Sequence, residues 1–166
     1  SLAPGNYTAV VTAADGGKGV ALVEAYDREV DAPATRLINL STRAQSGSGA
    51  NMLTAGLVIG GQGTLRLLVR AVGPGLAQFG VSGVLAQPTM RVYSGQTVIQ
   101  SNTGWTSGGL TEDLAAAARL TGAFPLAAGS ADCASVITLA PGSYTIQVSG
   151  VGGGTGEALV EVYVVP

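Results

Sequence analysis

The sequence contains no histidine, one cysteine and few charged residues, which make up only 11% of its 166 residues. Without histidine, neither a Ser-His-Asp triad nor a Cys-His nucleophile can be assembled, and no imidazole is present to bind zinc, copper or iron. The single Cys133 excludes an internal disulfide and a cysteine metal cluster. A glycosidase needs only two carboxylates, but most of the 10 acidic residues lie near turns or on strand faces. We therefore expect no enzyme.

The low charge also limits the partners of the chain. The net charge is −2 and the isoelectric point about 4.9, and no basic cluster could neutralise phosphates, so we expect no nucleic acid partner. No apolar run reaches the roughly 18 residues of a transmembrane helix, and no signal peptide is visible. Few Lys residues, many Gly, Thr, Ser and Val residues and an acidic isoelectric point are typical of secreted bacterial surface proteins. We therefore expect a secreted, extracellular or cell-surface location.

What the sequence does contain is an internal repeat. Residues 2–26 (LAPGNYTAVVTAADGGKGVALVEAY) align without a gap with residues 139–163 (LAPGSYTIQVSGVGGGTGEALVEVY), at an offset of 137 and with 15 identities in 25 positions. Each copy has a Pro-Gly turn, an alternating strand, a Gly-rich tip and a return strand. This pattern predicts a β-hairpin in each copy, which is not stable alone.

The offset defines the domain organisation. Residues 30–166 form one complete β-sandwich repeat with a period of 137, and residues 1–29 are a surplus closing hairpin homologous to 139–164. In one interpretation, both hairpins pack into one pseudo-symmetric sandwich, which we favour slightly for an isolated chain. In the other, the surplus hairpin reaches a neighbour and creates a head-to-tail contact. The residues expected to carry this assembly contact are Tyr7, Val11, Leu22, Glu24 and Tyr26.

The middle of the chain predicts further short strands separated by turn residues. Met52–Ile59 and Leu65–Val72 are nearly continuous apolar runs, which favours burial on both faces. Thr89–Tyr93 and Thr97–Gln100 form a hairpin over Ser94-Gly95-Gln96. The whole chain is expected to be all-β, an antiparallel, jelly-roll-like β-sandwich of about 9–11 strands.

One short helix is expected near residues 111–120 (TEDLAAAARL). Thr111 can act as its N-cap, and Glu112 and Asp113 suit the positive end of the helix dipole. Gly122 follows the expected end of the helix.

The loop around Trp105 is the best candidate for a ligand site. A Trp in a polar loop of a β-sandwich can stack on a sugar ring, and Asn102 and Tyr93 would complete such a site. The alternative is that Trp105 closes the end of the core beneath a loop, because Trp is highly buried on average.

Two equivalent glutamates, Glu24 and Glu161, lie in the repeated phrase ALVE, each on a strand face shared with Leu and Tyr. A carboxylate in such a place needs a cation. We expect structural ion pairs with Arg66 and Arg70, with Arg43 a further candidate partner, rather than a general acid and base.

No cofactor and no metal site are expected. Calcium bound by carbonyl oxygens of the Gly-rich tips is the remaining alternative, although the position equivalent to Asp15 is Gly152 and calcium usually takes several carboxylates. Cys133 is expected to be a small buried apolar residue rather than a nucleophile.

Three phrases together indicate a family. RLINLSTRA (36–44), RAVGPGLAQFGVSG (70–83) and the second copy of the repeat resemble an uncharacterised β-rich repeat module of large secreted and surface proteins of environmental bacteria. Such modules carry R-L-x-N-L-S-T-R, R-A-V-G-P-x-L and P-G-x-Y-T-x-x-V-S-G…G-x-A-L-V-E-V-Y. The resemblance implies an extracellular location, a β-rich fold and a stalk, adhesive or filament-forming role, and no catalytic residues. Cys133 and the neutral loop 101–105 depart from the pattern.

The hypothesis drawn from the sequence is therefore a non-catalytic extracellular structural or adhesive repeat module. It is a fibre or filament subunit if the surplus hairpin joins one unit to the next, with other copies or neighbouring repeats as partners. The alternative is a carbohydrate-binding module of a secreted multidomain protein, with a polysaccharide as partner and Trp105 in its site.

Overall fold

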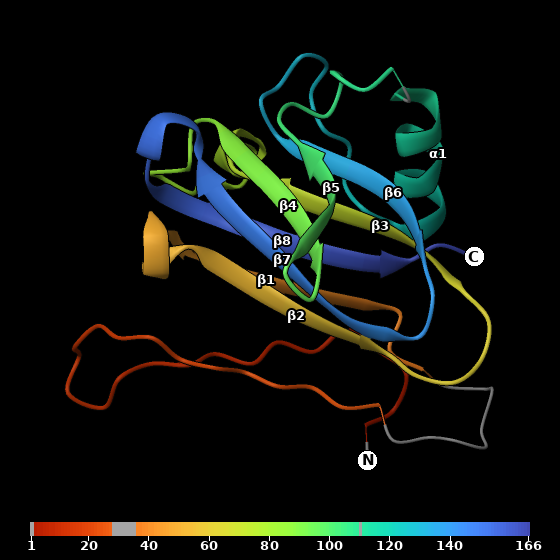
Figure 1. Cartoon of the computed structure of the whole chain (residues 1–166). Helices are drawn as coiled ribbons and strands as arrows, with labels where there is room; N and C mark the ends of the chain where they lie inside the picture. The colour runs from red at the N-terminus through yellow and green to blue at the C-terminus, as the bar shows by residue number, and fades with distance from the viewer. Residues whose placement is uncertain (1, 28–35, 110) are drawn as a thin grey trace. The chain divides into compact units, whose positions relative to one another are not determined.

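A computed structural model describes residues 2–27, 36–109 and 111–166 of the chain, which fall into two compact units, 1–37 and 38–166. All strands and helices of the described residues belong to the second unit (Figure 1). The strands are β1 (Asn39–Ser46), β2 (Leu53–Ile59), β3 (Leu65–Val72), β4 (Pro88–Ser94), β5 (Thr97–Asn102), β6 (Cys133–Leu139), β7 (Gly142–Gly150) and β8 (Gly156–Val164). The helices are α1 (Thr111–Thr121) and three short 3-10 helices, Gly49–Asn51, Pro74–Phe79 and Val151–Gly153.

The strands form two antiparallel four-stranded sheets, with the orders β1-β8-β3-β6 and β2-β7-β4-β5. Successive strands thus alternate between the sheets, apart from the paired β4 and β5, in the manner of a jelly roll, an eight-stranded double Greek key. The predicted jelly-roll sandwich is therefore confirmed, with 8 strands in the described residues rather than 9–11. The expected hairpin of β4 and β5 is present, with a register shift between Val92 and Tyr93.

The main core lies between the two sheets. Alternate residues of β3 point inward, and Leu67, Val69 and Ala71 are at most 1% exposed. They pack with inward residues of the facing sheet, including Met90, Val92, Ile146 and Val148. Because the opposite face of β3 is covered as well, this strand is buried on both sides, as its apolar run predicted.

The expectation of two buried faces is wrong for β2. Its residues alternate between buried and exposed, and Val58 is 76% exposed. A run of apolar residues therefore does not by itself distinguish a strand buried on both faces from a strand buried on one face.

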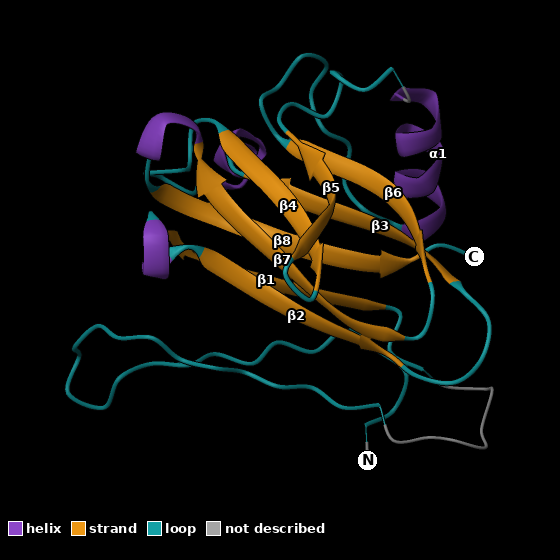
Figure 2. Cartoon of the chain, in the orientation of Figure 1, coloured by secondary structure: helices purple, strands orange, loops and turns teal. Residues whose placement is uncertain are grey.

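Helix α1 covers the outer face of the other sheet (Figure 2). Its buried Leu114 and Ala117 pack with Leu68, Trp105 and Ala134 in a second apolar cluster. The helix starts at Thr111, the first helical residue rather than the cap, and Gly122 ends it with a φ of 72°, a conformation that favours glycine. The predicted helix is thus confirmed with one more residue.

The second copy of the repeat is not a hairpin. Its strands β7 and β8 lie in different sheets and do not pair with each other: β7 pairs with β2 and β4, and β8 with β1 and β3. We call residues 139–164 the C-terminal arch, because they cross the core from one sheet to the other. Sequence alternation identified the two strands but not their partners, which lie up to about 120 residues away.

The first copy, residues 2–27, is called here the N-terminal copy. It contains two extended runs joined by a turn in which the Gly16 amide donates to the Ala13 carbonyl, and it forms no strand. Both sheets are built from residues 39–164 alone. The described residues of this copy therefore lack the two strands expected of a β-hairpin, while its packing, into the same sandwich or onto a neighbour, stays a prediction. Ser1 and residues 28–35, which include the end of the predicted surplus hairpin, lie outside the described residues.

Candidate functional site

A buried ion pair lies on the outer face of the helix-covered sheet. Arg70 of β3 and Glu161 of β8 stand directly opposite each other in the strand register, and Arg70 Nη2 lies 2.8 Å from Glu161 Oε2. Both residues are buried, with exposed fractions of 1% and 4%. This is the one ion pair within the described residues.

Further groups hold this pair in place. Arg70 Nη1 donates to the Phe124 carbonyl at 2.6 Å, and its guanidinium lies 4.2 Å from the centre of the Phe124 ring. The Tyr163 hydroxyl donates to Glu161 Oε1 at 2.7 Å. Burial, followed by this bond to Glu161, raises the pKa of Tyr163 well above its ordinary value. The two charges thus contact each other, the Phe124 carbonyl and ring and the Tyr163 hydroxyl within the protein, although Arg70 Nε has no hydrogen-bond acceptor among the described residues.

The other predicted partners are not brought together. Arg66 and Arg43 are exposed, and neither forms an ion pair within residues 36–109 and 111–166. Glu24 is exposed and accepts a hydrogen bond from the Tyr26 hydroxyl at 2.9 Å, which raises the pKa of Tyr26. Of the four residues expected in ion pairs, the structure joins Arg70 and Glu161.

Trp105 does not form an exposed sugar platform. Its ring is only 9% exposed in the cluster beneath α1, and its Nε1 donates to the Ala127 carbonyl at 3.0 Å. The side chain of Asn102 accepts from the Ala134 amide and donates to the Gly104 carbonyl, so its polar atoms are also used internally. Trp105 is thus buried, as the alternative expected, but it lies in the second cluster beneath α1 and not at the end of the core between the sheets.

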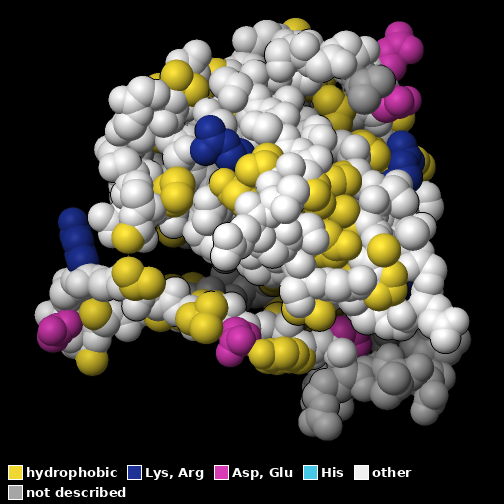
Figure 3. Space-filling model, viewed as in Figure 1, with side chains coloured by type: hydrophobic (Ala, Val, Ile, Leu, Met, Phe, Trp, Pro, Cys, Tyr) yellow, Lys and Arg dark blue, Asp and Glu magenta, His cyan; other side chains and the backbone are white. Residues whose placement is uncertain are grey.

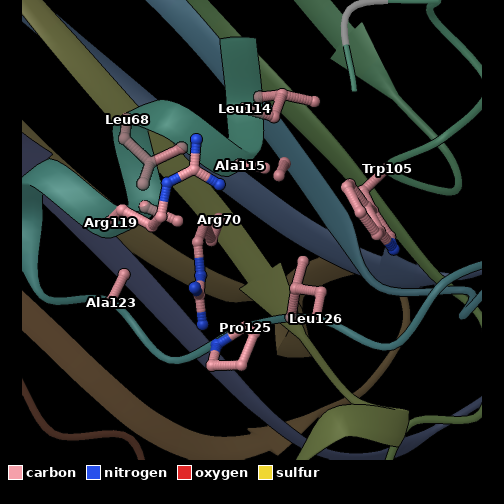
Figure 4. A pocket seen from close by; sticks show the side chains of 11 residues that line it. Leu68, Arg70, Trp105, Leu114, Ala115, Arg119, Ala123, Pro125 and Leu126 are labelled. Carbon is pink, nitrogen blue, oxygen red and sulfur yellow. The ribbon is translucent and has the colours of Figure 1, made fainter. Parts of the chain in front are cut away.

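An apolar cavity of about 270 Å³ lies beside Trp105, beneath α1 (Figure 4). Its lining combines apolar side chains with two arginines: Leu68, Arg70, Trp105, Leu114, Ala115, Ala118, Arg119, Ala123, Pro125, Leu126 and Ala134. No carboxylate, hydroxyl or thiol lines it among the described residues, so the cavity offers no nucleophile and no pair of acids.

Tyr93 lies on the other sheet, away from this cavity. It lines a shallow hollow of about 330 Å³ with Gly95, Gln96, Thr145 and Gln147. The strand register places Tyr93 opposite Thr145, and Arg91 beside it opposite Gln147. An aromatic ring next to two amide side chains in a hollow of a sheet face is a combination that can contact a sugar.

The N-terminal copy keeps the expected assembly residues on its surface. Exposed fractions are 57% for Tyr7, 59% for Val11, 82% for Leu22 and 76% for Tyr26. Figure 3 shows hydrophobic side chains exposed along this segment, and few, scattered charges on the face in view. A segment of extended backbone that exposes this many apolar side chains is typical of an interaction surface.

Sequence analysis missed Asp132, which is fully buried. Its Oδ1 accepts from the backbone amides of Gly73 and Gly75, at 2.9 and 3.1 Å, and its Oδ2 accepts from the Ser130 hydroxyl at 2.7 Å. The signal was the phrase Gly73-Pro74-Gly75, which leaves amides unpaired at a tight turn. Asp132 fastens the end of β3 to the start of β6.

Cys133 is buried, and burial raises the pKa of its thiol to about 11. The thiol therefore stays protonated at neutral pH, as in an inert core residue. No group of three or more acidic or cysteine side chains in the described residues could hold a metal ion. Asp15 instead accepts a hydrogen bond from the Gly17 amide.

The comparisons with known proteins are sparse. No model of a protein family matches the chain, and no curated protein matches its sequence. A solved structure similar to this chain is the pre-peptidase C-terminal domain of a collagenase from Bacillus anthracis, with 10% identity, 75% of this chain and 89% of that chain covered, and a TM-score of 0.45. Among the described residues, no helix is both long and apolar enough to cross a membrane.

Proposed function

We propose that this chain is a non-catalytic structural or adhesive module of an extracellular protein, which works in series with further modules of the same repeat. The observation that carries the proposal is the repeat itself. One copy is the C-terminal arch of a complete jelly roll, whereas the described residues of the other contribute no strand to either sheet and expose their apolar side chains. A segment of this kind gives a module a means of contacting a neighbour.

The chemistry of the buried polar groups supports a structural role. Glu161 and Asp132, the buried acids of the described residues, are held by Arg70, by backbone amides and by hydroxyls. The extracellular location is supported by the low charge and by the resemblance to modules of secreted bacterial proteins. In this proposal the fibre or stalk forms when the N-terminal copy of one unit engages the next.

The proposal is tested by measuring the size of the purified chain by light scattering over a concentration series, with negative-stain microscopy of the same samples. We expect concentration-dependent association, because extended segments with exposed apolar side chains and unpaired backbone groups pair with one another. Residues 36–166, which retain all eight strands, serve as the control and should remain monomeric. A full-length chain that stays monomeric at every concentration would refute the assembly role.

The hollow around Tyr93 supports a second candidate function, the binding of a polysaccharide. Here Tyr93 would stack on a sugar ring while Gln96 and Gln147 bind its hydroxyls, in place of the Trp105 site expected from the sequence. In pull-down on insoluble polysaccharides, we expect Tyr93→Ala to reduce retention at least about tenfold, the loss of about 1.4 kcal/mol of binding free energy.

The matched control for this experiment is Val58→Ala, an exposed apolar residue on the same sheet that does not line the hollow. It should leave retention unchanged. Equal retention of the wild-type chain and Tyr93→Ala, or no retention of either, would exclude glycan binding at this hollow.

A further inference from the structure

We infer that residues 2–27 are a second β7–β8 arch, whose partner is the six-stranded body, equivalent to β1–β6, of another module of the same repeat. The inference rests on the proposed function and names the partner of its N-terminal copy. In this arrangement residues 5–13 take the place of β7 in the partner, and residues 19–27 take the place of β8.

The local geometry of the two copies is the same. The Tyr7 hydroxyl donates to the Ala3 carbonyl at 2.7 Å, and the Tyr144 hydroxyl donates to the Ala140 carbonyl at 2.9 Å. The Tyr26 hydroxyl donates to Glu24, as the Tyr163 hydroxyl donates to Glu161. The N-terminal copy thus holds both tyrosines in the geometry of a docked arch although it forms no strand.

Gly19 carries the inference further. Its equivalent, Gly156 at the start of β8, lies so close to the chain at Val84 and Leu85 that a Cβ would sit 2.5 Å from the Leu85 amide nitrogen. No atom lies within 4 Å of the corresponding position at Gly19, and its φ is not in the left-handed region. Glycine weakens an extended segment, so this residue is explained by docking and not by the undocked segment.

The side chains of the N-terminal copy match the buried positions of the arch. Val11 and Val23 are equivalent to Val148 and Val160, which are at most 2% exposed, yet they are 59% and 56% exposed themselves. Glu24 is equivalent to Glu161, whose carboxylate pairs with Arg70. The acceptor must therefore supply an apolar core and an arginine at the position of Arg70.

The sandwich of residues 38–166 is not the natural acceptor, because its own arch already fills the positions of β7 and β8. The fit also differs: Ala9 and Ala25 stand where the C-terminal arch has the buried Ile146 and Val162. These smaller side chains would leave voids in this body. The partner is therefore a body without an arch of its own, with larger residues opposite Ala9 and Ala25.

The experiment uses the full chain carrying both Gly19→Val and Gly156→Val, in which neither copy can dock. It is refolded from denaturant with a labelled synthetic peptide of residues 2–27, and the folded sandwich is followed by circular dichroism and the fluorescence of Trp105. We expect the peptide to co-purify with the chain and restore the folded signals. A peptide with Ala9→Ile and Ala25→Val should bind at least about tenfold more tightly, since it fills the voids.

Two peptide variants give the specificity. Gly19→Val should abolish binding, because the added side chain meets the backbone at Val84 and Leu85. Val10→Gln should bind as the unmodified peptide does, since the equivalent Gln147 lies on the outer face of its sheet. Equal behaviour of the unmodified peptide and the Gly19→Val peptide, or failure of both to bind, would overturn the inference.

The full chain with Gly156→Val alone tests whether the N-terminal copy closes the body of another chain. Folded oligomers support the inference, whereas a folded monomer or an unfolded chain contradicts it. Peptide binding without association of the wild-type chain would keep the inference and refute the fibre role. Association of the wild-type chain without peptide binding would refute the inference and keep the fibre role.

Discussion

Replacing Arg70 by methionine should lower the free energy of unfolding by about 3–5 kcal/mol, the cost of leaving one member of a buried ion pair without its partner. Glu161 would keep the Tyr163 hydroxyl but would lose the cation at 2.8 Å in a place that water does not reach. Urea denaturation followed by the fluorescence of Trp105 measures the change.

The exposed Arg66 is the matched control, because it lies on the same face of β3, four residues before Arg70. Arg66→Met should change the stability by no more than about 0.5 kcal/mol. An equally small effect of Arg70→Met would contradict the structural role of the pair.

The double variant Arg70→Met with Glu161→Leu should recover most of the lost stability. Removing both charges removes two desolvation costs, and apolar replacements of buried pairs are often neutral or stabilising. Arg70 Nε has no hydrogen-bond acceptor in the described part of the chain, so the present pair is not fully satisfied. A double variant as unstable as Arg70→Met alone would mean that packing, and not the unpaired charge, sets the loss.

Asp132→Ala should destabilise the sandwich by about 4 kcal/mol. The change leaves the amides of Gly73 and Gly75 without their acceptor, and hydrogen bonds to a charged group contribute roughly 1.5–3 kcal/mol each. Thermal and urea unfolding of the full chain measure the effect.

Two graded variants separate hydrogen bonding from packing at this position. Asp132→Asn keeps an oxygen for the two amides and should cost about half as much, whereas Ser130→Ala removes one neutral donor and should cost about 1 kcal/mol. If Asp132→Ala cost no more than Ser130→Ala, the carboxylate would not hold the turn at Gly73.

Local signals in the sequence predicted the elements well. The alternation and apolar runs identified the strands, and the TED–AAAA phrase with Gly122 identified α1 almost to the residue. The β4–β5 pairing was also predictable, because only two residues separate these strands. Each of these features depends on neighbours along the chain.

The pairing of β7 and β8 could not be predicted in the same way. Two adjacent strands with a Gly-rich tip look like a hairpin whether they pair with each other or cross between sheets, because both arrangements bury alternate residues. The burial of Trp105 is a similar case: its loop is polar, and α1, which covers it, lies later in the chain. The sequence predicted that Glu161 pairs with an arginine of this strand. Which arginine it pairs with, Arg70 and not Arg66, depends on the register of β3 against β8.

The register of β1 against β8 has a mechanical consequence. Asn39, where the sandwich begins, stands opposite Tyr163, close to where it ends, and β1 is an edge strand that pairs with β8 alone within its sheet. Tension applied through these two ends would break the hydrogen bonds between β1 and β8 one pair after another, starting at Asn39, instead of shearing all of them together. A tethered module of this kind would give way first at β1 and lengthen under a small force, while the core behind it stays packed.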